Sequence, residues 1–120
     1  MKIAIPTRQN SLDSEIDERF GRAKGFIVYD SDTGTYEWVD NKQSVQSTQG
    51  AGIQSAKNVI DSGAEILIAG NVGPKAYSIL RASGVDVYIC DVMKASQAIS
   101  EFKNGKLKKA SEATVESHWQ

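Results

Sequence analysis

Hydrophobic and polar positions along the chain first follow a strand-like pattern. Residues 2–6, 25–30 and 36–39 are short runs rich in β-branched and aromatic side chains, which is typical of strands. The turn Asp32-Thr33-Gly34 separates the second run from the third and predicts a hairpin. The first part of the chain is therefore expected to form an antiparallel three-stranded meander.

The periodicity then changes to that of alternating helices and strands. Apolar side chains recur at helical spacing in residues 53–60, 76–80 and 95–102, and a glycine follows each stretch. Between these helices lie the apolar runs 66–69 and 85–89, which predict two further strands. The first of these runs has no polar position, so it indicates a central strand that is buried on both faces.

The element order βββαβαβα limits the topology. Because crossovers between parallel strands are almost always right-handed, the simplest arrangement is a five-stranded mixed sheet of order 3-2-1-4-5. The first two helices are expected on one face and the third on the other. This predicts an α/β fold, a three-layer α/β/α sandwich with a ribonuclease-H-like motif. One domain is expected over residues 1–107, followed by a flexible C-terminal tail, residues 108–120.

Composition and charge disfavour several classes of protein. The chain has 14 Lys and Arg against 15 Asp and Glu, and this balance argues against a nucleic-acid partner held by bulk positive charge. No apolar run approaches the roughly 20 residues that span a bilayer, so no membrane association is expected. A single cysteine, Cys90, favours a reducing compartment and a cytoplasmic location.

The side chains needed for catalysis are also missing, so we expect no enzyme activity. A nuclease of this fold needs carboxylates from several strands, but Asp13, Glu15, Asp17 and Glu18 fall in one polar segment and residues 2–6 contain no carboxylate. A cysteine nucleophile is not supported, because the only histidine, His118, lies in the predicted tail. Cys90 ends an apolar strand, so it is interpreted as a core residue and only a weak candidate for a metal ligand.

The predicted strand order leaves a crevice where the connections of adjacent strands diverge. Three glycine-bearing segments are expected to face it, residues 19–22, 49–52 and 70–74. Glycine allows backbone N–H groups to approach a ligand, and helix N-termini add partial positive charge, so the crevice would suit an anionic or sulfide-rich ligand. Simple turn glycines and solvated arginines remain open as the alternative. The candidate binding residues are Arg19, Phe20, Gly21, Arg22, Gln49, Gly50, Gly52, Gly70 and Gly73.

Several motifs occur in an order that resembles the nitrogenase accessory factor family. They are MKIAIPT at 1–7, ERFGRA at 18–23, GAGI at 50–53, GPKA at 73–76, GVDVY at 84–88 and KNGKL at 103–107. This family includes NifX-like and NafY-like carriers and the dinitrogenase iron-molybdenum cofactor biosynthesis domain at the C-terminus of NifB. The resemblance covers residues 1–107.

The resemblance implies a non-catalytic carrier that binds the iron-molybdenum cofactor or an iron-sulfur precursor during metallocluster assembly. Many members have histidine where this chain has Arg19 and Gln49, and neither a guanidinium nor an amide is a good ligand for soft metals. We therefore expect transient docking of the anionic cluster surface on the backbone N–H groups of Gly50 to Gly52 and the charge of Arg19, with no cofactor tightly bound. Cluster-assembly or nitrogenase proteins would be the partners of a monomer or weak dimer. The alternative is a small-anion-binding or regulatory protein-interaction module of the same fold.

Overall fold

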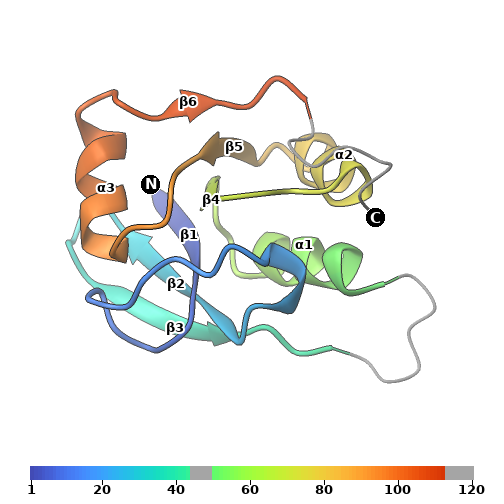
Figure 1. Cartoon of the computed structure of the whole chain (residues 1–120), viewed down its shortest axis with the longest axis horizontal. Coiled ribbons are helices and arrows are strands. Elements are labelled where there is room, and N and C mark those ends of the chain that lie inside the picture. Colours follow the sequence, from blue (N-terminus) through green and yellow to red (C-terminus); the bar gives the residue numbers. More distant parts are fainter. Residues whose placement is uncertain (44–49, 113–120) are drawn as a thin grey trace.

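The computed structural model of the chain describes residues 1–43 and 50–112. Its elements alternate after an initial meander, as the sequence pattern predicts (Figure 1). The strands are β1 (Lys2–Thr7), β2 (Gly25–Asp30), β3 (Tyr36–Asp40), β4 (Ile66–Ala69), β5 (Asp86–Ile89) and β6 (Lys108–Lys109). The helices are η1, a single 3-10 turn (Phe20–Arg22), α1 (Ala51–Asp61), α2 (Pro74–Ala82) and α3 (Ala95–Lys103).

The strands form one mixed sheet of order β3-β2-β1-β4-β5-β6. Strand β1 pairs antiparallel with β2 and parallel with β4, and β4 pairs parallel with β5. The α/β class and the order 3-2-1-4-5 are thus confirmed, but the predicted number of five strands was wrong.

The sixth strand was missed because its sequence carries no strand pattern. Lys108 and Lys109, which the sequence assigned to the tail, pair antiparallel with Ile89 and Tyr88. Two exposed lysines show no apolar alternation, although lysine is common on sheet edges because it discourages further strand pairing. Beyond this strand, the Tyr77 hydroxyl on α2 donates to the Ala110 carbonyl at 3.1 Å. Residues 113–120 of the predicted tail lie outside the described residues.

Helices cover both faces of the sheet, as predicted (Figure 1). Strand β4 is buried along its whole length, and its side chains alternate between two apolar clusters. Leu67 packs with residues of α1 and α2, while Ile66 and Ile68 pack with residues of α3. No helix among the described residues is long and apolar enough to cross a membrane.

The topology brings three connections to one end of the sheet. Thr7 at the end of β1 pairs with Gly25 at the start of β2, and Gly25 also pairs with Asp40 at the end of β3. Turn η1 directly precedes β2, the chain enters α1 after β3, and α2 follows the end of β4. Because β1 and β4 are parallel, η1 and the starts of α1 and α2 lie at the same end of the sheet.

Candidate functional site

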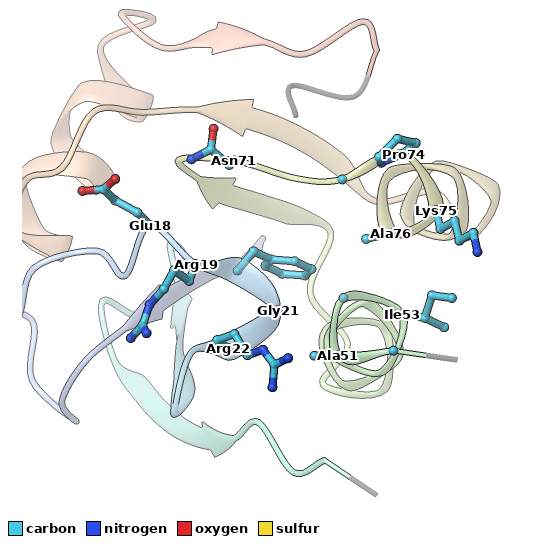
Figure 2. A pocket seen from close by; sticks show the side chains of 14 residues that line it. Glu18, Arg19, Gly21, Arg22, Ala51, Ile53, Asn71, Pro74, Lys75 and Ala76 are labelled. Carbon is cyan, nitrogen blue, oxygen red and sulfur yellow. The ribbon is translucent and has the colours of Figure 1, made fainter. Parts of the chain in front are cut away.

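A cleft of about 730 Å³ opens at this end of the sheet, between η1 and the first turns of α1 and α2 (Figure 2). Its volume lies within the range of small-molecule sites, roughly 300–1,000 Å³. Its walls come from three segments that are far apart in sequence, residues 18–22, 50–53 and 71–76.

The structure brings most of the predicted site residues together, but Gly70 is not among the residues that line the cleft. A Cβ on Gly70 would lie 3.7 Å from the Cys90 carbonyl oxygen and from the Glu18 Cα. Gln49 lies outside the described residues. The predicted residues along the cleft are Arg19, Phe20, Gly21, Arg22, Gly50, Gly52 and Gly73.

The sequence did not identify all of the lining. Lys75 follows Pro74 in the first turn of α2, where a cation near a predicted helix start could have been a signal. Ala51, Asn71 and Pro74 lie in the segments 49–52 and 70–74 that were expected to face the crevice, although they were not named as binding residues. The lining residues outside the expected segments are Glu18, Ile53, Lys75 and Ala76.

Within the described residues, the N-cap residues of the two helix starts at the cleft make no side-chain capping bond. Gly50 and Gly73 occupy the N-cap positions of α1 and α2, and neither first turn contains an acidic residue. The first bond along α1 is donated by Gln54 to the Gly50 carbonyl at 3.4 Å, so the N–H groups of residues 51–53 precede the helical ladder. These N–H groups and the helix dipoles favour an anion.

Helix α3, which begins away from this cleft, has partners for the N–H groups of its first turn. The N–H groups of Ala95 and Ser96 donate to the carbonyls of Ser14 and Leu12, each at 2.9 Å. The loop after β1 therefore caps α3 internally. The starts of α1 and α2 instead lie side by side at the cleft, where a Cβ on Gly52 would be 3.8 Å from the Ala76 Cβ.

Three cationic residues, Arg19, Arg22 and Lys75, are part of the cleft lining, and they differ in whether their side chains are ion-paired. Arg19 is tied to the buried carboxylate of Asp17, whose Oδ1 accepts from the Arg19 N–H at 3.0 Å and from Nε at 3.4 Å. Figure 2 shows the Arg19 guanidinium pointing away from the cleft. Arg22 and Lys75 are exposed, and neither forms an ion pair within the part of the chain that the structure describes. Arg22 and Lys75 are thus the cations most available to a ligand.

The glycines of the cleft permit close contact between backbones. A Cβ on Gly21 would lie 3.0 Å from the Gly52 nitrogen and 3.1 Å from its Cα, so η1 rests directly on the start of α1. Gly50 has a φ of 93°, a conformation that side chains with a Cβ rarely adopt. Below these glycines, the buried Phe20 ring packs on Phe26, with 5.8 Å between ring centroids.

Gly21→Ala is expected to destabilise the protein by about 1–3 kcal/mol, because the added methyl group meets backbone atoms that must move apart. Urea unfolding followed by circular dichroism measures this change. Gly70→Ala is the matched control, since its Cβ would have only ordinary contacts of 3.7 Å. Equal stability of the two variants would contradict a tight contact between η1 and α1.

Cys90, the weak candidate for a metal ligand, does not line the cleft. It is buried in the apolar cluster on the α3 face of the sheet. Burial, and to a smaller extent the carboxylates of Asp91 and Glu101, raises the pKa of the Cys90 thiol to about 11. Within residues 1–43 and 50–112, no group of three or more His, Cys, Asp or Glu side chains could hold a metal ion.

The raised pKa of Cys90 predicts a loss of stability in alkaline solution. The thiol loses its proton near pH 9.0 when unfolded but only near pH 11 when folded, so its contribution is full below pH 9.0 and lost as pH rises through about 11. We expect the unfolding midpoint of the wild type to fall more steeply over this interval than that of Cys90→Ala. Parallel curves for the two proteins would contradict this prediction.

Comparison with known proteins extends the motif resemblance to the whole domain. A family model described as dinitrogenase iron-molybdenum cofactor matches residues 1–105. An uncharacterized protein of Methanocaldococcus jannaschii is 33% identical over an alignment of 114 residues that covers 91% of each chain.

Two solved structures are similar in both sequence and fold. The apo form of the orange protein from Desulfovibrio gigas has a TM-score of 0.89 and 38% identity, covering 95% of this chain and 96% of that one. The NMR structure of a candidate NifB protein from Thermotoga has a TM-score of 0.80 and 34% identity, covering 97% and 98%. With the family model matching nearly the whole described domain, the chain belongs to the dinitrogenase iron-molybdenum cofactor family.

Proposed function

We propose that this protein is a non-catalytic carrier that holds an anionic metallocluster transiently in the cleft. The cargo would be the iron-molybdenum cofactor or an iron-sulfur precursor of it. The observation that carries the proposal is the position of two helix starts and two cationic residues, Arg22 and Lys75, around one open cleft. Within the described residues, the N-caps of both helices make no side-chain bond and neither cation has an ion pair. Membership of the family supports this class of cargo.

The described lining donates hydrogen bonds and contains no soft metal ligand. Backbone N–H, guanidinium and ammonium groups suit the sulfide, oxo or carboxylate atoms on the outside of a cluster. Neither cysteine nor histidine is among the lining residues that the structure describes. The cargo would therefore keep its own metal ligands, and its release would require no exchange of metal–protein bonds.

The same lining supports a role without catalysis. Among the described lining residues, Glu18 is the one carboxylate, and none is serine, threonine, cysteine, histidine or tyrosine. General acid–base or nucleophilic catalysis depends on such groups, commonly in pairs. The chain has one cysteine, Cys90, and so cannot form an internal disulfide. Because the cytoplasm keeps thiols reduced, we place the carrier there.

The test uses a synthetic [4Fe–4S] cluster capped by 2-mercaptoethanol thiolates, which is a dianion. Under anaerobic conditions and low salt, we expect the cluster to co-elute with the protein in gel filtration and to show its visible absorption. Because the attraction is largely between exposed charges, about 0.5 M KCl should release it. Serum albumin serves as the control for nonspecific adsorption.

Two results would contradict the carrier proposal. Salt-resistant binding that disappears in Cys90→Ala would make the cysteine a metal ligand. Binding of inorganic phosphate without any binding of the cluster would favour the small-anion module, because helix N-termini are also phosphate sites.

A further inference from the structure

Behind the cleft, a buried polar network joins three segments of the chain. Asn41, in the segment that follows β3, is only 6% exposed. Its Nδ2 donates to the Ala23 carbonyl at 2.9 Å and to Ser55 Oγ at 2.8 Å. Its Oδ1 accepts from Asn58 Nδ2 at 2.8 Å. One amide side chain therefore links the end of η1 to helix α1.

Ser55 and Asn58 extend this network along α1. The Ser55 side chain is fully buried, and its hydroxyl donates to the Gly21 carbonyl within η1 at 3.3 Å. Asn58 Nδ2 also donates to the Lys42 carbonyl at 2.9 Å. These contacts attach both η1 and the segment after β3 to the same face of the helix.

The two elements joined by the network are also two walls of the cleft. Turn η1 carries Arg22, and α1 presents the N–H groups of residues 51–53. Asn41, Ser55 and Asn58 do not line the cleft themselves. The Gly21–Gly52 contact sets how closely the walls approach, while hydrogen bonds one helical turn further along α1 resist sliding and rotation.

Apolar side chains could fill the same space without directional bonds. Buried polar groups are costly unless all of them are paired, and a fully paired network fixes one relative arrangement of its segments. The part of the chain that the structure describes has no buried side-chain polar atom without a partner. The network is therefore suited to define geometry at the cleft.

We propose that Asn41 is a positioning residue for binding of the cluster. It holds η1 against α1 so that Arg22 and the N–H groups of residues 51–53 act on the same anion. This inference rests on the proposed carrier function. It assigns Asn41 no contact with the cargo.

Two variants test the inference. Asn41→Asp keeps the size and Oδ1 of the side chain but places an acceptor against the Ala23 carbonyl, and Ser55→Ala removes the bond to the Gly21 carbonyl. Ser62→Ala is the matched control, because its hydroxyl bonds the Val59 carbonyl at the far end of α1. If Asn41→Asp fails to fold, Ser55→Ala still provides the test.

The first measurement is the affinity for the thiolate-capped [4Fe–4S] cluster at low salt. The second is the set of backbone amide NMR shifts in the protein without cluster. For the folded variants we expect affinity about tenfold or more below wild type, with shift changes concentrated at η1 and the start of α1. Ser62→Ala should keep wild-type affinity.

The possible failures are distinguishable. Wild-type affinity in a folded variant, or an equal loss in Ser62→Ala, would overturn the positioning role and leave the carrier function standing. Absence of binding by the wild type would overturn the carrier function, and the role of Asn41 in it, whatever the amide shifts show.

Discussion

The double variant Arg22→Glu, Lys75→Glu is expected to lose retention of the thiolate-capped cluster, with affinity at least about 100-fold below wild type. Both side chains line the cleft beside the uncapped helix starts, and neither has an ion pair among the described residues. Each reversal replaces attraction by repulsion, and about 1.4 kcal/mol corresponds to a tenfold change in affinity. Anaerobic titration followed by visible absorption measures the loss.

A second double variant controls for net charge. Lys106→Glu, Lys108→Glu produces the same change in net charge at residues that do not line the cleft, so its affinity should stay within a few-fold of wild type. Similar losses in both double variants would show that net charge, and not the cleft, governs binding.

The structure also changes what is expected of Arg19. From the sequence, its charge was expected to hold an anion together with the backbone N–H groups of Gly50 to Gly52. Its Nε instead lies 3.4 Å from Asp17 Oδ1, and the side chain points out of the cleft (Figure 2). Arg19→Glu should therefore weaken binding less than Arg22→Glu does. The sequence could place both arginines near the cleft but could not show which one was already paired.

The topology was predictable because strong local patterns agreed with one another. The run Ile66–Ala69 has no polar position, and only a central strand with helices on both faces can bury such a run. The handedness of crossovers then fixed the strand order. Strand β6 was not predicted, because it forms through pairing with β5 and its two residues show no local strand pattern.

The candidate site was only partly predictable for a related reason. Glycine marks Gly21, Gly52 and Gly70 alike as special in the sequence, but only the folded chain shows that Gly70 faces the Cys90 carbonyl behind the cleft. Asn41 gave no signal, because one asparagine after a strand is indistinguishable from ordinary turn chemistry. Its importance arises from acceptors on η1 and α1, which are distant in sequence.

Leu67→Ala is expected to cost about 2–5 kcal/mol of unfolding free energy, because the truncated side chain leaves a cavity that packed neighbours fill only partly. Leu67 is completely buried in β4, where it pairs with Ala4 of β1 and Val87 of β5 and faces α1 and α2. Urea unfolding measures the loss, with the exposed Ser78→Ala on α2 as a control that should change stability by less than about 0.5 kcal/mol. A cost below about 1 kcal/mol for Leu67→Ala would contradict a tightly packed layer between β4 and these helices.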